Sequence, residues 1–240
     1  FSKIEDLAKI KTITFEDEIN VPDDAVESWD ISDTQDGSVI AYLVENGIAA
    51  SSIAMDVNKG PLERARMHII GHGLKGQIET RLSDGLKKVN PGEVNGMIAA
   101  GMGGALVIKI LEDSKEVVDS LDFCVLQPQS EIAKVRKYLN KNGLMIADED
   151  MVEEDGKFYP MMKVVHGEVE QYEEYEYIYG KKLLEKKHPV LQKFLLREQY
   201  VQESIVEQLS KHIGSESAEQ RTREILHERQ YTLQALERFE

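Results

Sequence analysis

The feature of this sequence that most constrains its fold is an alternation of short apolar segments with amphipathic segments between residues 39 and 165. The apolar runs 94–100 and 121–127 have the length of buried strands. Residues 103–112, which lie between them, carry apolar side chains at helical spacing. Strands that alternate with helices predict βαβ units and a largely parallel sheet, so the fold class expected for this part of the chain is α/β.

The pattern changes after the alternating region. Residues 145–153 and 158–165 flank a Glu-Asp-Gly-Lys turn, which predicts a terminal β-hairpin. Residues 166–240 carry apolar side chains at helical spacing in two stretches, which predicts an αα-hairpin or a short antiparallel coiled coil. We therefore expect a Rossmann-like domain over residues 1–165, with an atypical segment 1–38, and a helical hairpin over residues 166–240.

Charge and cysteine content narrow the class of protein. The formal net charge of −15 argues against a general nucleic-acid binder, which is usually basic, although an acidic RNA enzyme can carry a locally basic face. Residues 1–38 hold 3 Lys and Arg against 11 Asp and Glu, so more than half of the net negative charge of the chain lies in this segment. Cys124 is the single cysteine and lies in an apolar run, so we expect an inert buried thiol and a reducing cytoplasm.

A glycine-rich run is the strongest candidate for a binding site. It comprises Ala100, Gly101, Met102, Gly103 and Gly104, between an expected buried strand and an expected helix. Glycines at the carboxyl end of a strand let a ligand approach the backbone closely, and the helix amides then point at the same crevice. A tight strand-to-helix turn without a ligand explains the run equally well from spacing alone.

Two acidic positions follow other expected strands. Asp56, with Val57 after it, ends the strand over 52–57, where nucleotide-binding folds hold ribose hydroxyls. Asp84 follows the strand over 77–82, and its carboxylate could accept a hydrogen bond from an adenine amino group while the backbone of Gly85 and Leu86 meets a ring nitrogen. The competing interpretations are a surface aspartate and an ordinary Asp-Gly turn.

The remaining polar positions give weaker signals. Gln127, Pro128 and Gln129 end another expected strand, where amides could contact a base or a cofactor, or could simply form a turn. His68 and His72 are four residues apart on one expected helix, but the glutamate of a zinc-protease motif is missing between them, so we expect no metal site.

These segments together resemble the bacterial tRNA adenine-22 N1-methyltransferase family of class I methyltransferases. The matching stretches are 42–47, 54–57 with 59–61, 81–86, 100–104, 126–129, 154–159 and, in the helical region, 179–190. The resemblance implies transfer of a methyl group from S-adenosylmethionine to N1 of an adenine in tRNA. It also implies that Asp56 holds the cofactor ribose, that Asp84 and Leu86 hold its adenine, and that Gly101 to Gly104 line the methyl-transfer crevice. The helical hairpin would help to grip the tRNA.

One segment departs from the family pattern. The family's first-strand motif, of the form D-x-G-[SC]-D-H, corresponds here to residues 30–39, where Ser32 replaces the glycine and the Asp-His pair is out of register. No catalytic aspartate is therefore assigned. Divergence, a reading-frame error and a rebuilt site remain open, and a weak or inactive tRNA-binding relative is the alternative function. A nicotinamide-dependent oxidoreductase is less favoured, because no G-x-G-x-x-G follows a first strand.

The expected partners and location follow from the same features. The resemblance implies tRNA as the partner and the cytoplasm as the location. No apolar run approaches the roughly 20 residues that a membrane helix requires, so we expect no membrane association. No metal partner is expected, and a monomer is slightly favoured.

Overall fold

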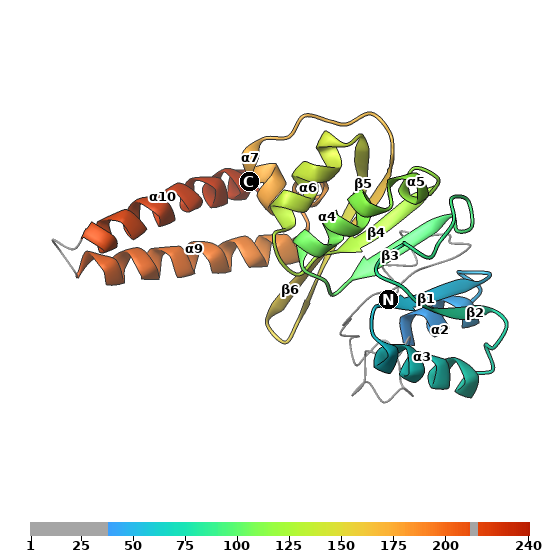
Figure 1. Cartoon of the computed structure of the whole chain (residues 1–240). Coiled ribbons are helices and arrows are strands. Elements are labelled where there is room, and N and C mark those ends of the chain that lie inside the picture. Colours follow the sequence, from blue (N-terminus) through green and yellow to red (C-terminus); the bar gives the residue numbers. More distant parts are fainter. Residues whose placement is uncertain (1–37, 212–215) are drawn as a thin grey trace. The chain divides into compact units, whose positions relative to one another are not determined.

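A computed structural model describes residues 38–211 and 216–240 of the chain (Figure 1). The expectations for residues 30–37, including the first-strand motif, therefore lie outside the described residues. Contacts divide the described chain into two compact units, the first containing residues up to 148 together with 159–170, and the second containing 149–158 and 171–240. The tip of a β-hairpin thus joins the helical unit, and the expected domain boundary between residues 165 and 166 stays a prediction.

The first unit contains the alternating strands and helices that the sequence pattern predicts (Figure 1). Its elements are α2 (Ser38–Glu45), β1 (Ser52–Asp56), α3 (Lys59–Gly71), β2 (Ile78–Leu82), β3 (Gly96–Ala100), α4 (Gly104–Asp113), α5 (Lys115–Val118), β4 (Phe123–Gln127) and α6 (Ile132–Lys141), and it shares β5 (Leu144–Glu154) and β6 (Lys157–His166) with the second unit. The short helix α5 is the one element here that the sequence pattern did not predict.

The strands form two sheets. β1 pairs with β2 in parallel, with Asp56 opposite Leu82 at their carboxyl ends. The other sheet has the order β3-β4-β6-β5, in which β3 and β4 are parallel and β6 is antiparallel to β4. The expected parallel pairing and the antiparallel terminal strand are confirmed. Among the described residues, β1 and β3 make no ladder with each other.

Burial explains why the five-residue strands are stable in these positions. Every residue of β1 and of β3 is buried, as expected for parallel strands that are covered on both faces. One apolar cluster joins α2, β1, α3, β3 and β4, and it includes Ile40, Leu43, Ala54, Ile98 and Val125. The two sheets of the first unit therefore share a core although they share no hydrogen-bonded edge.

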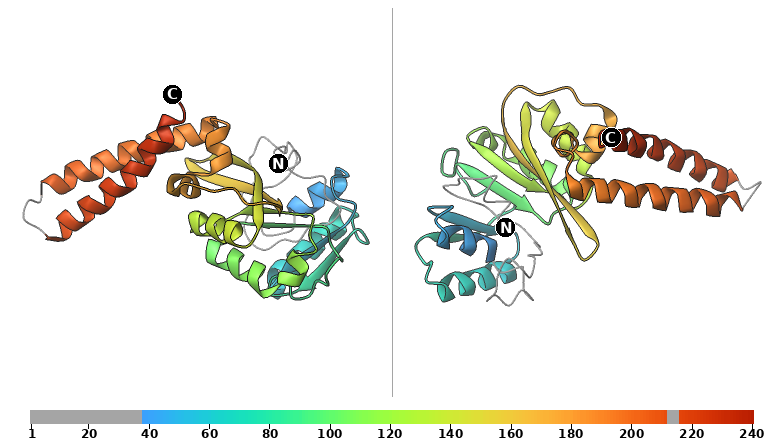
Figure 2. Two further views of the ribbon diagram at one scale, coloured as in Figure 1. Left: turned by 90° about the horizontal axis from the view of Figure 1, so that it is seen from above. Right: turned by 180° about the vertical axis from the view of Figure 1, so that it is seen from behind.

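The second unit is a helical hairpin on a short helical base, seen from two further sides in Figure 2. Its helices are α7 (Glu174–Tyr179), α8 (Lys181–Glu185), α9 (Pro189–Ser210) and α10 (Glu216–Glu237). The long helices α9 and α10 lie side by side in every view, which confirms the predicted αα-hairpin. None of the described helices is both long and apolar enough to cross a membrane.

A buried polar cluster lies inside this hairpin. The Thr232 side chain on α10 is fully buried, and its Oγ1 lies 2.8 Å from the Tyr179 hydroxyl of α7. The same Oγ1 accepts a hydrogen bond from Gln202 Nε2 of α9 at 3.0 Å. Because buried polar groups need partners, the cluster favours one alignment of these three helices over others.

His188 connects the base of the hairpin to the β-hairpin tip in the same unit. His188 is buried, and its Nε2 lies 2.8 Å from Oδ1 of Asp150 on β5. The backbone N–H of Met151 donates to the same oxygen at 2.7 Å. His188 also occupies the N-cap position of α9, directly before Pro189.

Candidate functional site

The loops that follow β3 and β4 are joined to each other by backbone hydrogen bonds. The Gly101 N–H donates to the Gln127 carbonyl oxygen at 3.1 Å, and the Gln129 N–H donates to the Met102 carbonyl at 2.9 Å. Beyond them, the Gly104 N–H donates to the Ser130 carbonyl at 3.1 Å. The glycine run and the Gln127–Ser130 segment are therefore one unit at the strand ends, which we call the paired loops (residues 101–104 and 127–130).

Glycine is required at two positions of the paired loops for different reasons. Gly101 has a φ of +79°, a backbone conformation that side chains disfavour. At Gly104 a Cβ atom would lie 2.5 Å from the Ser130 carbonyl oxygen and 2.9 Å from Cγ2 of Val135. Since real Cβ atoms do not approach that closely, only glycine allows the two loops to meet here. The glycine run thus has a tertiary packing role in addition to any ligand it meets.

Gln127 contributes its side chain as well as its backbone. Its Oε1 accepts a second hydrogen bond from the Gly101 N–H at 2.8 Å, so one amide oxygen fixes the first residue of the glycine loop. Neighbouring Pro128 is buried, whereas Gln129 is exposed. The substrate contact of Gln127–Gln129 stays a prediction, and Gln127 has a structural role that the sequence did not reveal.

The sequence predicts Ser130 as the N-cap of a helix over residues 130–141, because serine is a preferred N-cap residue. The expectation that Ser130 caps the following helix is wrong, because Glu131 occupies the N-cap position with a left-handed φ of 51°. The carbonyl of Ser130 is engaged by Gly104 instead. Ser130 instead serves the pairing of the two loops, in which it also forms a parallel β-bridge with Gly103.

Asp56 lies at the carboxyl end of β1 with only 6% of the residue exposed. Its Oδ1 accepts a hydrogen bond from the Asn58 N–H at 2.5 Å, and its carbonyl accepts one from the Ser83 N–H at 3.0 Å. A buried carboxylate held at a strand end has the position in which nucleotide folds bind ribose. Val57, the next residue, is exposed.

Asp84 carries a charge that is balanced by two lysines. Lys87 Nζ hydrogen-bonds Oδ2 of Asp84, and Lys109 Nζ lies 3.7 Å from the same oxygen. The hydrogen bond from Lys87, and then the charge of Lys109, lower the pKa of Asp84. Both lysines also lie within 3.4 Å of Oδ2 of Asp113. This ion-pair group holds the aspartate in its ionised form on the protein surface.

The residues after Asp84 pack against α4. Gly85 has a φ of +60°, and a Cβ there would lie 2.9 Å from Cγ1 of Ile110. Leu86 is buried, so its backbone and not its side chain is the part able to meet a ligand. Because α4 starts at Gly104 and also carries Lys109, the loop after β2 and the glycine run are both anchored to one helix.

Three other side chains, those of Cys124, His68 and His72, have structural surroundings. Cys124 is fully buried, and burial raises the pKa of its thiol to about 12, which agrees with the expected inert role. The His68 and His72 rings lie 4.4 Å apart, and His72 Nδ1 lies 2.8 Å from Oε1 of Glu45. Within residues 38–211 and 216–240, no group of three or more His, Cys, Asp or Glu side chains has the geometry to hold a metal.

Comparisons with known proteins agree with this fold. The family model described as tRNA (adenine(22)-N(1))-methyltransferase matches residues 35–234. The tRNA (adenine(22)-N(1))-methyltransferase of Bacillus subtilis is 31% identical over 191 residues, which cover 77% of this chain and 79% of that protein. The matched range starts at residue 35, in the middle of the segment 30–39 that departs from the family motif.

Solved structures have the same fold as this chain. The crystal structure of the B. subtilis m1A22 tRNA methyltransferase TrmK superposes with a TM-score of 0.76 at 25% identity, covering 98% of this chain and 96% of that chain. The M. capricolum TrmK, solved with S-adenosyl-homocysteine, superposes with a TM-score of 0.78 at 19% identity and covers 100% of this chain and 97% of that one. This chain therefore belongs to the tRNA (adenine(22)-N(1))-methyltransferase family.

Proposed function

We propose that this chain transfers a methyl group from S-adenosylmethionine to N1 of adenine 22 in tRNA. The observation that carries the proposal is the match of one family model across residues 35–234, which include every strand end of the candidate site. The alternative of a catalytically inactive relative has no support among the relatives, which are named as methyltransferases.

The proposed methyl transfer requires the protein mainly to position its two reactants. S-adenosylmethionine supplies a methyl group on a positively charged sulfur, so the N–CH₃ bond to adenine N1 forms as the S–CH₃ bond breaks. The N1 lone pair is the nucleophile, and no proton needs to leave for the bond to form. The protein's main tasks are therefore to place the adenine edge in line and to draw the base out of the RNA stack.

The residues of the first unit fit the proposed cofactor. Asp56 would accept hydrogen bonds from the ribose hydroxyls, because its carboxylate is buried at the end of β1 and already oriented by Asn58. Both lysine contacts of Asp84 use Oδ2, so Oδ1 would accept the adenine amino group, beside the backbone of Gly85 and Leu86.

The paired loops would form the wall nearest the transferred methyl group. Gly101, Met102, Gly103 and Gly104, with Ala100 before them, come directly after a buried strand and have a backbone path fixed by Gln127–Ser130. Gln127, Pro128 and Gln129 would contact the substrate adenine from the neighbouring strand end.

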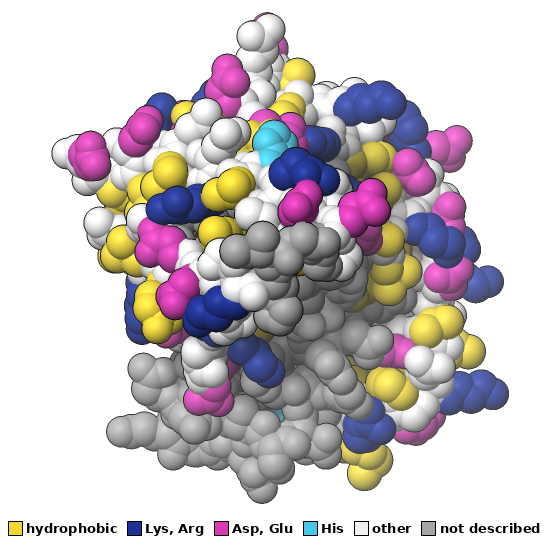
Figure 3. Space-filling model, turned by 90° about the vertical axis from the view of Figure 1, so that its left-hand side faces the viewer, with side chains coloured by type: hydrophobic (Ala, Val, Ile, Leu, Met, Phe, Trp, Pro, Cys, Tyr) yellow, Lys and Arg dark blue, Asp and Glu magenta, His cyan; other side chains and the backbone are white. Residues whose placement is uncertain are grey.

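The helical hairpin would contact the tRNA without relying on net charge. Residues 171–240 hold 11 Lys and Arg against 13 Asp and Glu. On the face drawn in Figure 3, basic side chains are interspersed with acidic and apolar ones. Because phosphate neutralisation needs clustered cations, we expect the hairpin to act by shape and by individual contacts, with a weak salt dependence.

The test uses the whole chain, an unmodified tRNA transcript and S-adenosylmethionine labelled in its methyl group. We expect label in N1-methyladenosine at position 22, and none in a transcript with guanosine at that position. Asp56→Asn should raise the KM for S-adenosylmethionine about tenfold while leaving the KM for tRNA unchanged. If the wild-type chain neither binds S-adenosylmethionine nor transfers label, the proposal is wrong.

A further inference from the structure

The loop that follows β2 is held by one arginine side chain. Arg81 lies on β2, and its Nη1 donates to the carbonyl oxygen of Lys88 at 2.8 Å. Its Nη2 donates to Oε1 of Glu93 at 2.5 Å, near the far end of the same loop. The guanidinium therefore contacts the loop between residues 83 and 93 at two separate points.

A third contact anchors the guanidinium to its own strand. Arg81 Nε and Nη2 donate to the two carboxylate oxygens of Glu79 at 2.6 and 2.9 Å. This bidentate geometry fixes the plane of the guanidinium, which a lysine ammonium cannot do. Only 20% of the Arg81 side chain is exposed, compared with 50% for Arg221 in the ion pair with Glu224 on α10. The Arg81 side chain is thus partly buried, and it donates hydrogen bonds to Glu79, Lys88 and Glu93.

The loop has internal contacts that transmit this anchoring to Asp84, Gly85 and Leu86. Ser83 Oγ donates to the Gly85 carbonyl at 2.7 Å and accepts from the Lys88 N–H at 3.2 Å. The carbonyl of Lys88 is the group that Arg81 holds. Hence the backbone of 84–86 is bounded on one side by the end of β2 and on the other by a residue fixed through Arg81.

The far end of the loop is fixed through Glu93. Its Oε2 accepts the Asn90 N–H at 2.9 Å, while Oε1 accepts from Arg81. The hydrogen bond from Arg81, and then the one from Asn90, lower the pKa of Glu93 to about 2. Glu93 therefore stays ionised throughout the neutral range, and the connection does not weaken near neutral pH.

We propose that Arg81 is a positioning residue for the adenine end of the cofactor site, because it holds the loop that presents Asp84, Gly85 and Leu86. The inference rests on the proposed function. Arg81 itself would not touch the nucleotide. It fixes the Lys88 carbonyl and Glu93, and the loop geometry follows from those two contacts.

The test compares Arg81→Lys with wild type and with the matched control Arg221→Lys, which makes the same change in an exposed ion pair. Arg81→Lys should raise the KM for S-adenosylmethionine, and the Kd for adenosine measured by calorimetry, by about tenfold. Its kcat and its KM for tRNA should stay within about twofold of wild type, and Arg221→Lys should leave the KM for S-adenosylmethionine and the Kd for adenosine at their wild-type values.

A second pair of variants separates anchoring of the loop from stability of the strand. Glu93→Gln weakens the contact between Arg81 and the loop, whereas Glu79→Gln weakens only the contact within β2. We expect Glu93→Gln to raise the Kd for adenosine more than Glu79→Gln does, which also tests the inference if Arg81→Lys fails to fold. Wild-type affinity for adenosine in both Arg81→Lys and Glu93→Gln would overturn the role of Arg81 even if the wild-type enzyme methylates tRNA. Absence of S-adenosylmethionine binding by the wild type would instead refute the proposed function.

Discussion

The paired loops of the first unit and the buried polar cluster of Thr232, Tyr179 and Gln202 in the second unit are held together by different kinds of contact. In the paired loops, backbone meets backbone, and at Gly104 no Cβ atom fits. In the cluster, three side chains from three helices are joined by two hydrogen bonds that meet at the Thr232 hydroxyl. A single added methyl group should therefore disable the first region, whereas the second should lose stability by the energy of one or two hydrogen bonds.

The largest effect is expected from Gly104→Ala. The new Cβ would lie 2.5 Å from the Ser130 carbonyl oxygen, so the loops must separate. We expect methyl transfer to fall about 100-fold, because displacements of about 1 Å near a reacting group have that consequence. The unfolding free energy should fall by about 1–3 kcal/mol through overpacking. Single-turnover transfer of labelled methyl and urea denaturation measure the two effects.

The matched control is Gly71→Ala, at the end of α3, where a Cβ meets nothing within 4 Å. This variant should retain wild-type transfer. Wild-type activity in Gly104→Ala would show that the two loops need not meet for function, and the contrast between the two regions would disappear.

An intermediate effect is expected from Thr232→Val, which keeps the side-chain shape but removes the hydroxyl. Tyr179 and Gln202 would lose a buried partner, at a cost of about 1–3 kcal/mol in unfolding free energy. Thr222→Val on the same helix is the control, because the Thr222 hydroxyl donates to the Ala218 carbonyl of its own helix and not to a side chain of another helix among the described residues. Urea denaturation should separate these variants, while calorimetry should give both a wild-type Kd for S-adenosylmethionine.

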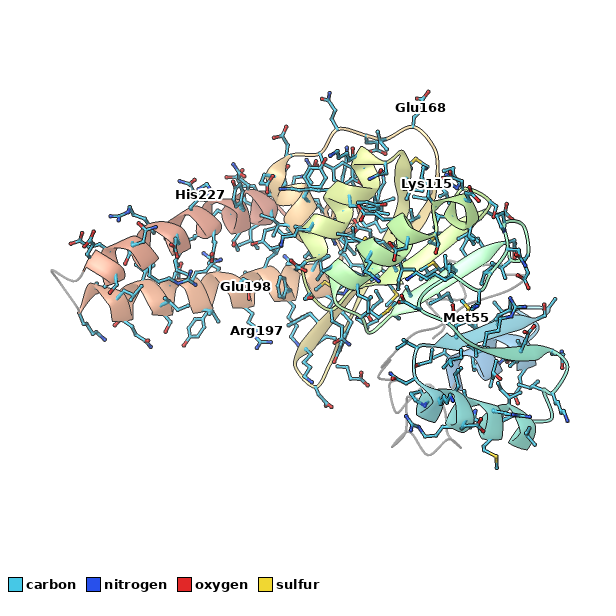
Figure 4. All side chains as sticks on the ribbon, in the orientation of Figure 1. Met55, Lys115, Glu168, Arg197, Glu198 and His227 are labelled. Atoms are coloured by element: carbon cyan, nitrogen blue, oxygen red, sulfur yellow. The ribbon has the colours of Figure 1, made fainter. Side chains whose placement is uncertain are left out.

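The smallest effect is expected from Glu198→Gln in the helical hairpin. Figure 4 shows Glu198 on the side of α9 that faces α10 and Arg197 on the opposite side. Burial, with a smaller contribution from the charge of Glu228, raises the pKa of Glu198. The folded state thus holds its proton more tightly than the unfolded state, so the ionised side chain lowers stability as pH rises above the ordinary range of a glutamate.

Glu198→Gln should therefore raise the thermal midpoint by about 1 °C at pH 7 and leave it unchanged at pH 4, where the wild-type side chain is largely protonated. Glu207→Gln, at an exposed position of the same helix, serves as the control and should not raise the midpoint. An equal rise at both pH values would contradict an electrostatic origin.

Local sequence patterns predicted most elements of the fold because the relevant signals are short-range. The alternation of apolar segments predicted β1 to β4, and the glycine run was correctly placed between β3 and α4. The signals failed where a distant residue sets the outcome. Serine is a residue type that commonly caps helices, but the carbonyl of Ser130 accepts a hydrogen bond from the N–H of Gly104, 26 residues earlier. No local pattern could have indicated that pairing.

The candidate site was also predictable only in part: the sequence indicated the positions of its residues but not their contacts. The positions of Asp56 and Asp84 at strand ends followed from the strands themselves, since a residue after a strand lies at its end. Their surroundings did not follow. The lysine partners of Asp84 include Lys109, which comes from α4, and the arginine that holds the Asp84 loop lies on β2 among ordinary alternating residues.

By itself, the sequence determined where strands end, where glycines interrupt the side-chain pattern and which helices present an apolar face. These properties depend on residues within a few positions of one another, so their energies are set locally. Tertiary structure alone decided that residues 101–104 pair with 127–130, that Arg81 fixes the Lys88 carbonyl, and that Thr232 meets Tyr179 and Gln202. Each of these contacts joins groups whose distance is defined only once the strands and helices have packed, because hydrogen bonds act over about 3 Å.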